Sequence, residues 1–384
     1  MTGAVKIIRL GDVATYINGY AFKPSDWSEV GKPIIRIQDL TGTNNNPHCF
    51  NGKIPSKYEV KNGDVLISWS ASLGVYIWNR GEAYLNQHIF KVVFDKIGVD
   101  KKFFAYQVPL LLSSAMSSAH GCTMKHLTKP LFDGLLFKLP PLAEQKRIVA
   151  KIDAAFEKID ALKANAEKNL ANAKELFQSA LDEAMRPKTG WVEKRLGEVC
   201  EGKLSYGTSS PSKGYDARVR YIRITDIDDN GRLLNDFVSP KEYEAKHVLE
   251  DGDLVFARTG ATVGKSYMYS PSDGACVYAG YLIRARVDQS IIRPKYLFYF
   301  TKTSRYKLFI QLSQAAAAQP NVNAEKYGNM LVPIPPVHEQ DEIVSCIGKT
   351  QGLILQLQQN YSQQITDCAE MRQAILREAL EGRL

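Results

Sequence analysis

The chain has 384 residues, of which 45% are hydrophobic, and a formal net charge of +8. This length predicts two or three domains. The N-terminus lacks an apolar stretch of signal-peptide length, no apolar run approaches about 18 residues, and the six cysteines show no CxxC or CxxH spacing. These features argue against a secreted, membrane-spanning, disulfide-stapled or zinc-bound protein, and we expect a cytoplasmic protein without a metal site.

The positive charge lies in two separate stretches. Residues 1–142 carry 16 Lys and Arg against 10 Asp and Glu, and residues 186–336 carry 22 against 16. Residues 143–185, with 7 against 8, and residues 337–384, with 4 against 7, are slightly acidic. A moderately basic surface is common, so charge by itself leaves nucleic-acid binding an open question.

The first basic stretch is predicted to be an α+β block. Residues 58–68 read as a turn that leads into a buried strand, with Gly63 supplying the turn backbone. Residues 86–94 alternate apolar and polar side chains, which is the pattern of a half-buried strand. A helix is expected over residues 101–119.

A long amphipathic helix is predicted next, over residues 139–185. About forty residues without Gly or Pro follow Pro140 and Pro141, and apolar residues recur at a period of about 3.6. Prolines and Glu144 suit a helix N-terminus, and Pro187 ends the helix. At about 1.5 Å per residue the helix is roughly 65 Å long, so its apolar stripe needs a partner helix of similar length.

The second half of the chain repeats the first. Four pairs of segments match: 9–13 with 195–199, 35–39 with 222–226, 62–67 with 251–256, and 139–145 with 334–340. The offset grows from 186 to 195 and then holds at 195 from Leu139 onward. The repeat predicts a second α+β block, with a half-buried strand at residues 281–287 and a helix at 294–314, followed by a second long helix from residue 334.

The two long helices are expected to pair with each other. Each helix leaves its own block and runs toward the other block, so an intramolecular pair is antiparallel. The alternative is a coiled coil with a second chain, which the matched lengths and shared offset make less attractive. The predicted seam consists of Ile148, Ile152, Ile159, Leu162 and Leu170 in the first helix and of Ile343, Ile347, Ile354, Leu357, Ile365 and Ile375 in the second.

Residues 260–266, Gly-Ala-Thr-Val-Gly-Lys-Ser, invite comparison with a phosphate-binding loop, but the sequence argues against one. A Walker A loop has the pattern GxxxxGK[ST] and is followed by a helix. This segment is one residue shorter between its glycines, and residues 267–269 read as a strand. The copy in the first block, residues 68–75, has no lysine. A loop that differs this much within a common frame is more typical of readout than of catalysis.

Both copies of this loop carry small hydroxyl residues, and the second adds an arginine and a lysine. Arginine can bind guanine through two hydrogen bonds, and Ser and Thr can reach base edges or phosphates. Residues 121–127 and 318–323, shortly before the two Pro-Pro helix starts, offer Lys, His and amide groups. A purely structural function, as a polar hairpin tip or as helix caps at Asn321 and Asn323, remains an alternative.

No catalytic constellation stands out. The sequence contains no HExxH, no paired-carboxylate motif, no Ser/His/Asp set in a motif context, no Gly-rich cofactor loop and no (Asn/Asp)-Pro-Pro-(Tyr/Phe). The six histidines are dispersed. We expect a binding protein and not an enzyme.

The repeated Pro-Pro-x-x-Glu-Gln helix start, the two dissimilar blocks in a common frame and the matched long helices resemble the specificity subunits of type I restriction–modification systems. The resemblance covers essentially the whole chain. It implies two target recognition domains that each read half of a split double-stranded DNA site, with the paired helices as a spacer. It also implies partners: two methyltransferase subunits, which use S-adenosylmethionine to methylate adenine, and restriction subunits, which require ATP and Mg.

On this reading residues 1–138 and 187–333 are the recognition domains, and residues 139–186 and 334–384 are the spacer helices. Candidate DNA contacts come from both domains: Lys23, Arg36, Ser70, Ser72, Lys125, His126, Lys213, Arg223, Arg258, Thr259, Thr262, Lys265, Gln319 and Asn321. No catalytic residue and no cofactor of this chain's own is expected. The alternative function is a non-catalytic coiled-coil scaffold for other proteins, which basic charge alone does not separate from DNA binding.

Overall fold

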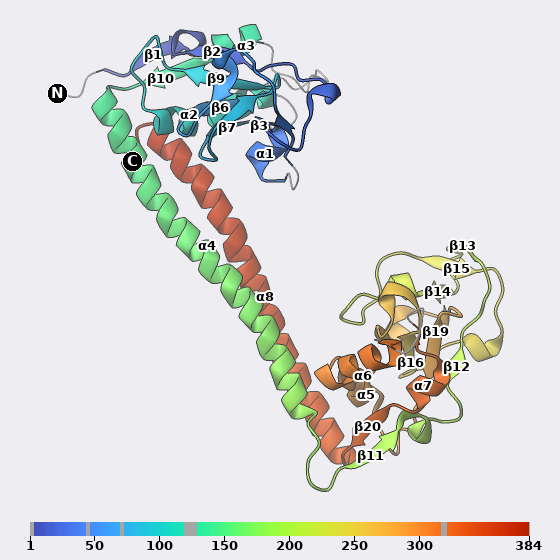
Figure 1. Ribbon diagram of the computed structural model, residues 1–384. Helices are drawn as coiled ribbons and strands as arrows, with labels where there is room; N and C mark the ends of the chain where they lie inside the picture. The colour runs from blue at the N-terminus through green and yellow to red at the C-terminus, as the bar shows by residue number, and fades with distance from the viewer. Residues whose placement is uncertain (1–3, 44–46, 70–72, 119–128, 316–320, 384) are drawn as a thin grey trace. The chain divides into compact units, whose positions relative to one another are not determined.

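The computed structural model describes residues 4–43, 47–69, 73–118, 129–315 and 321–383 (Figure 1). The chain divides into two compact units: unit 1 comprises residues 1–165 and 364–384, and unit 2 comprises residues 166–363. Each unit contains an α+β block and a share of two long helices, so the predicted α+β repeat is confirmed. In the described parts of the chain, no helix is both long and apolar enough to cross a membrane.

Unit 1 begins and ends its block with a ribbon of two antiparallel strands, β1 and β10. Its two larger sheets have the strand orders β2-β9-β6-β7, which is antiparallel, and β4-β3-β8-β5, in which β3 and β8 run parallel. The elements are β1 (Lys6–Arg9), β2 (Thr15–Asn18), β3 (Lys32–Ile35), α1 (Ile37–Thr41), β4 (Cys49–Phe50), β5 (Glu59–Val60), β6 (Val65–Ser68), β7 (Gly74–Ile77), β8 (Ala83–Leu85), β9 (Ile89–Val93), α2 (Lys101–Ser118), α3 (Lys129–Gly134) and β10 (Leu136–Leu139).

Unit 2 repeats this topology. The ribbon β11-β20 corresponds to β1-β10, the antiparallel order β12-β19-β16-β17 corresponds to β2-β9-β6-β7, and the parallel pair β14-β18 corresponds to β3-β8. The elements are β11 (Val192–Arg195), β12 (Ser205–Tyr206), β13 (Ser212–Gly214), β14 (Arg220–Ile222), β15 (Val238–Pro240), β16 (Leu254–Ala257), β17 (Ser266–Met268), β18 (Cys276–Tyr278), β19 (Leu282–Ala285), α5 (Pro294–Phe300), α6 (Ser304–Ala315), α7 (Ala324–Gly328) and β20 (Leu331–Ile334).

The predicted helix over residues 294–314 is two helices, α5 and α6. Thr301 and Thr303 interrupt it, because the hydroxyl of Thr301 donates to the Phe298 carbonyl and that of Thr303 donates to the Phe300 carbonyl. The Thr303 hydroxyl also accepts a bond from the Tyr306 N–H, as a helix cap does. Side-chain capping by threonine therefore overrides the helical pattern here.

The two long helices are α4 (Leu142–Ala184) and α8 (Val337–Leu380), and they pack together within each unit. In unit 1 the N-terminal part of α4 shares a core with the C-terminal part of α8, where Arg372 pairs with Asp160. In unit 2 the C-terminal part of α4, with Leu181, shares a core with the N-terminal part of α8, with Ile347. The intramolecular antiparallel pair is confirmed, and Figure 1 shows α4 and α8 side by side.

The seam of this pair follows a seven-residue repeat and not the 3.6-residue line. In α4 the buried positions include Ile152, Ile159, Ala166 and Ala173, and Ile148 is also buried. Two helices that wrap around each other keep a 3.5-residue period, so a 3.6-residue line drifts off the contact. Two predicted seam positions differ for this reason: Leu162 is 55% exposed and Leu170 is only partly buried.

The second helix shows the same drift. Ile347 and Ile354 are buried, and Cys368, two heptads after Ile354, is buried as well. Leu357 does not lie in the seam, since it is 39% exposed. The remaining predicted seam positions are partly buried: Ile343, Ile365 and Ile375.

Candidate nucleic-acid interface

The glutamine of the repeated Pro-Pro-x-x-Glu-Gln segment is buried in both units. In unit 1, Gln145 is 1% exposed. Its amide nitrogen donates to the Pro140 carbonyl at 2.8 Å, and its amide oxygen accepts from the Asp100 N–H at 2.9 Å. Gln145 therefore ties the start of α4 to the start of α2.

Gln340 does the same in unit 2, where it is fully buried. Its amide nitrogen donates to the carbonyls of Ile291 and Pro335, both at 2.9 Å, and its amide oxygen accepts from the Arg293 N–H at 2.8 Å. The glutamine of this motif, which carries much of the resemblance, orients the helices and is too buried in both units to contact a ligand.

The second repeated motif, Asn/Asp-Gly-Asp, is a charged turn at the start of a buried strand. In unit 1 the Asp64 carboxylate accepts from the Lys61 N–H and lies 2.9 Å from the Lys91 ammonium. Gly63 has φ of +86°, which favours glycine. The aspartate thus both closes the turn and neutralises a cation on the neighbouring strand β9.

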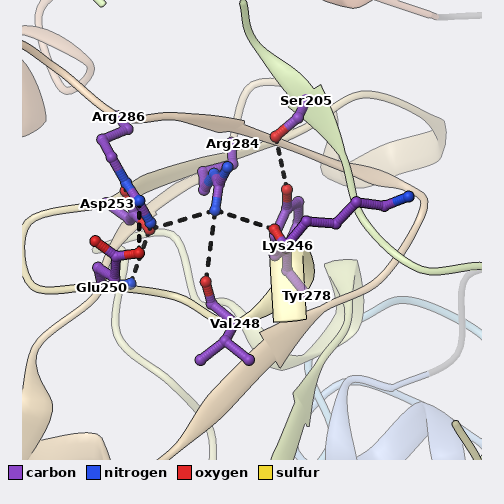
Figure 2. Close-up of polar contacts among 8 residues, drawn as sticks. All are labelled: Ser205, Lys246, Val248, Glu250, Asp253, Tyr278, Arg284 and Arg286. Carbon is purple, nitrogen blue, oxygen red and sulfur yellow. Dashed lines mark hydrogen bonds and ion pairs between the residues drawn. The ribbon is translucent and has the colours of Figure 1, made fainter. Parts of the chain in front are cut away.

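The corresponding turn in unit 2 holds a larger ion-pair cluster (Figure 2). Arg286 binds the Asp253 carboxylate through two hydrogen bonds of 2.9 and 2.8 Å and reaches Glu250 at 2.6 Å. The hydrogen bonds that Arg286 donates to Asp253 raise the pKa of Arg286, and the guanidinium stays charged. Arg284 donates to the carbonyls of Lys246 and Val248. Part of the positive charge of this block is therefore neutralised by ion pairs within the fold.

Arg223 was predicted as a DNA contact, but the structure ties it to two carboxylates. Its guanidinium donates to Asp226 at 3.0 and 2.7 Å and to Asp236 at 2.6 Å. Asp226 is 1% exposed, and its hydrogen bonds raise the pKa of Arg223. Breaking this network would leave a buried carboxylate unpaired, so Arg223 stabilises the turn after β14.

Arg258 lies at the end of β16 between two tyrosine rings. Its guanidinium carbon is 5.0 Å from the ring centre of Tyr206 and 5.9 Å from that of Tyr281, both within cation–π range. The rings are 43% and 58% exposed. Nε donates to the Gly280 carbonyl at 3.2 Å, while the two terminal nitrogens form no hydrogen bond among the described residues. This arrangement presents an oriented fork of donors at the surface.

The structure brings two of the predicted segments together around Arg258. Thr259 and Asn321 form a backbone bridge, and the Val322 N–H donates to the Arg258 carbonyl at 3.0 Å. The side-chain oxygen of Asn321 is buried and has no hydrogen-bond partner within the described part of the chain. Asn323, by contrast, caps α7 through the Lys326 N–H.

Lys265 and Thr262 do not join this cluster. The Lys265 ammonium lies 2.9 Å from the Asp229 carboxylate and 3.2 Å from the Ile227 carbonyl. Thr262 donates its hydroxyl to the Thr259 carbonyl within the turn. Strand β17 follows at Ser266, so this segment has no helix after it to bind a phosphate. Arg258 and Lys265 thus contact different residues, although they are only seven positions apart in the sequence.

Unit 1 has a different aromatic cluster. It lies near residues 36–39, which correspond to residues 223–226 of unit 2. The ring of Trp27 stacks on His48 with centroids 4.3 Å apart, and the Arg36 guanidinium lies 5.5 Å from the Trp27 ring. Trp27 is 42% exposed, and Lys23 is exposed nearby in sequence. The Arg36 N–H donates to Asp39, as Arg223 does in unit 2, but the side chain takes another direction.

The remaining candidates are either paired or outside the described residues. Lys213 lies 3.0 Å from Asp216. Hydrogen bonds from the Arg218 N–H, from Lys213 and from Ser239 hold the pKa of Asp216 well below its usual range. Five candidates lie outside the described residues: Ser70, Ser72, Lys125, His126 and Gln319.

Sequence reasoning missed the aromatic residues that flank the arginines. Tyr206, Tyr281 and Trp27 are exposed large rings, and none of them was a candidate contact. A signal existed for Tyr281, which follows Gly280 directly and precedes a strand with buried residues. Exposed aromatic rings beside an arginine suit stacking or orientation at a nucleic-acid surface.

Comparison with known proteins agrees with this organisation. The family described as type I restriction modification DNA specificity domain matches residues 3–172 and again residues 188–367. The specificity subunit of the type I restriction enzyme EcoBI from Escherichia coli is 25% identical over 408 residues, which cover 98% of this chain and 85% of the relative. That of MjaVIII from Methanocaldococcus jannaschii is 22% identical over 380 residues, which cover 91% and 86%.

Solved structures share the fold. A chain from a study of complex assembly and conformational transition of the type I R-M system matches with a TM-score of 0.77 and 20% identity, covering 99% of this chain and 98% of that one. The crystal structure of the HsdS subunit from Thermoanaerobacter tengcongensis matches with a TM-score of 0.61 and 20% identity, covering 99% and 97%.

Proposed function

The chain belongs to the family of type I restriction–modification DNA specificity subunits, and we propose that each of its two units reads one half of an asymmetric, bipartite DNA site. The observation that carries this proposal is the double match to the specificity domain, once in each half of the chain. Two domains with one frame and different surface loops suit two different half-sites. The chain would supply recognition and leave methylation and cleavage to partner subunits.

In unit 2 the proposed reading element is Arg258 with Thr259 and Asn321. Arg258 is supported by its oriented guanidinium between Tyr206 and Tyr281, because two donors in a fixed fork match the O6 and N7 acceptors of guanine. Lys and Arg elsewhere on the block would bind phosphates without regard to sequence.

In unit 1 the proposed counterpart is the cluster of Arg36, Trp27 and His48, together with Lys23. Its chemistry differs from that of the Arg258 cluster, which supports different target bases for the two units. Ser70 and Ser72 and the segments 121–127 and 318–323 remain further candidates for base or phosphate contacts on the strength of their sequence.

For the long helices we propose two functions, spacing and docking. As continuous elements that run from one block to the next, α4 and α8 would set the number of base pairs between the half-sites. Exposed leucines on the helices, namely Leu162 at 55%, Leu353 at 64% and Leu357 at 39%, suit contact with two methyltransferase subunits. Those subunits would bind S-adenosylmethionine, and restriction subunits would bring the ATP- and Mg-dependent activity.

A block exchange tests the half-site assignment. Residues 1–138 are replaced by the matching block of another specificity subunit, the hybrid is produced with its methyltransferase partners, and modified adenines in the host genome are sequenced. We expect a change in one half of the methylated motif only. Exchange of residues 187–333 is the matched control and should change the other half. A single exchange that alters both halves would contradict the modular reading.

Duplex binding distinguishes this function from that of a protein scaffold. For DNA binding, the logarithm of the affinity should fall linearly with the logarithm of the salt concentration, because phosphate contacts release counterions. A chain that joins its partners but shows no affinity for duplex DNA in the assembled complex would favour the scaffold.

A further inference from the structure

Unit 2 contains a cavity that DNA reading does not use. Its volume is about 580 Å³, and it lies among α4, α5, α6, α8 and the turn before β17. Small-molecule sites typically span roughly 300–1,000 Å³ and combine apolar walls with a few polar groups. Phe177, Phe298 and Tyr299 supply aromatic walls, and three lysines and one carboxylate line the same space. The cavity is therefore large enough for a small ligand, and its lining carries net positive charge.

Lys302 is the central cation of this cavity. Its ammonium donates to the hydroxyl and carbonyl of Ser266 at 3.1 and 3.3 Å and lies 4.8 Å from the ring centre of Phe298. Burial lowers the pKa of Lys302 to about 8, although Asp228 and Asp229 act through space to raise it. Within the described residues no carboxylate forms an ion pair with Lys302, so an anion in the cavity would find an unneutralised charge.

The two other lysines that line the cavity are Lys265 and Lys307, and they too outnumber the carboxylates there. Lys265 forms an ion pair with Asp229, which is the only carboxylate among the described residues that line the cavity. Lys307 donates to the neutral side-chain oxygen of Gln178 at 2.5 Å. Lys302 and Lys307 thus face the cavity with neutral partners, and a dianionic group could bind both.

The repeat differs from unit 2 at two residues that line this cavity. With the constant offset of 195, Gln351 of the cavity corresponds to Phe156, and Phe177 corresponds to Arg372. In unit 1, Arg372 lies 3.9 Å from the ring centre of Phe156 and pairs with Asp160. At this place in unit 1 the Arg372 side chain therefore covers the Phe156 ring, whereas Phe177 and Gln351 line the cavity in unit 2.

The lysine is also specific to unit 2. Arg293 and Asp100 are equivalent, because their N–H groups bind the matching glutamines of the two long helices. Counting from these residues, Lys302 corresponds to Pro109 of α2. Unit 2 therefore differs from its own repeat in the charge at this position and in the side chains at residues 177 and 351.

We propose that this cavity binds a small aromatic phosphate of mononucleotide size, with the phosphate at Lys302 and Lys307 and the ring between Phe177 and Tyr299. Lysine ammonium groups bind phosphate as point charges, and two of them suit one dianionic group. Aromatic walls suit a heterocycle. The proposal is independent of DNA reading, because none of these residues contributes to the Arg258 cluster.

Calorimetric titration of the full chain with AMP tests the proposal, with inorganic phosphate and adenosine as separate arms. We expect saturable binding of AMP, competition by phosphate, and at least tenfold weaker binding of either fragment. Absence of saturable AMP binding at millimolar concentrations would overturn the proposal. Binding of phosphate as tight as that of AMP would overturn the aromatic part of the site.

Three variants locate the site. Lys302→Met should weaken AMP binding at least tenfold, and Gln351→Phe, which introduces the residue that unit 1 has at the corresponding position, should abolish it. Lys246→Met is the matched control: Lys246 also lies in unit 2, but it is exposed, pairs with Glu244 and does not line the cavity, so binding should be unchanged. Circular dichroism verifies folding of each variant. Binding of AMP to Lys302→Met with wild-type affinity would refute the assignment.

Discussion

Replacement of Arg258 is the sharpest test of DNA reading by unit 2. Its guanidinium is held by Tyr206, Tyr281 and the Gly280 carbonyl, so little side-chain entropy remains to be lost on binding. A bidentate arginine–guanine contact contributes about 1–3 kcal/mol of discrimination, which corresponds to roughly 5–150-fold in affinity. We therefore expect Arg258→Ala to lose discrimination of that size at one position of one half-site.

The assay is fluorescence anisotropy with the assembled methyltransferase complex. A panel of duplexes carries every substitution in each half-site, and each duplex is titrated at several salt concentrations. Arg258→Lys is the informative companion, since it keeps the charge and loses the fork. It should lose the same discrimination as Arg258→Ala while the salt dependence stays that of the wild type.

Two results would refute the reasoning. If Arg258→Ala weakens all duplexes equally and lowers the salt slope by about one, Arg258 contacts a phosphate. If Arg258→Lys retains full discrimination, the fork is unnecessary. Tyr281→Phe, which keeps the ring against Arg258, should retain discrimination, whereas Tyr281→Ala should reduce it, because the guanidinium loses one wall.

Three further predictions concern stability and spacing. Gln340→Ala should lower hydrogen-exchange protection at the start of α8 by about 3–5 kcal/mol, since three backbone groups lose their hydrogen-bond partner. Gln145→Ala, which affects two such groups, should lower protection at the start of α4 by about 2–3 kcal/mol. Equal losses in the two variants would contradict this prediction. Below pH 8 the free energy of unfolding of Lys302→Met should exceed that of the wild type by about 1–3 kcal/mol. In denaturant titrations this difference should close as the pH rises from about 8 toward 10.5, because the unfolded wild type then binds more protons than the folded wild type. A difference that stays constant with pH would refute this prediction. Deletion of one heptad from both long helices should shorten the preferred spacer by roughly three base pairs with unchanged half-sites, as read from the methylated motif, and an unaltered spacer in a folded variant would count against the helices as a ruler.

The helices and the repeat were predictable because their signals are periodic and local. Hydrophobic spacing located α4 and α8, and an offset that holds at 195 paired them. The exact seam was not predictable from a 3.6-residue line, since supercoiling moves the contact to a seven-residue repeat. The 3.6-residue line passes through Ala166 and Ala173, which are buried, but also through Leu162, which is 55% exposed. In a narrow two-helix seam the repeat distance matters more than the size of the apolar side chain.

The surroundings of the surface arginines were harder to predict, because some of their partners are distant in sequence. Arg223 carries a local signal, an aspartate three residues later, that indicates the ion pair it forms with Asp226. Arg258 has no such signal: Tyr206 and Tyr281 come from two other strand ends, and only the sheet order β12-β19-β16 places them beside it. Charge counted along the sequence does not distinguish these two cases.

The distribution of buried polar groups explains why two recognition surfaces can diverge on one frame. The repeated motifs form self-contained networks: a glutamine satisfies the backbone at each long-helix start, and an aspartate satisfies a turn and a strand cation. Losing any member of such a network leaves a buried group unpaired, at a cost of about 1–3 kcal/mol, so these residues are tightly constrained. Arg258, which is half-buried, and Trp27, which is 42% exposed, lie outside these networks, so their substitution leaves the networks intact. Surface chemistry can therefore change in one unit without a stability penalty in either frame, which is what independent reading of two half-sites demands.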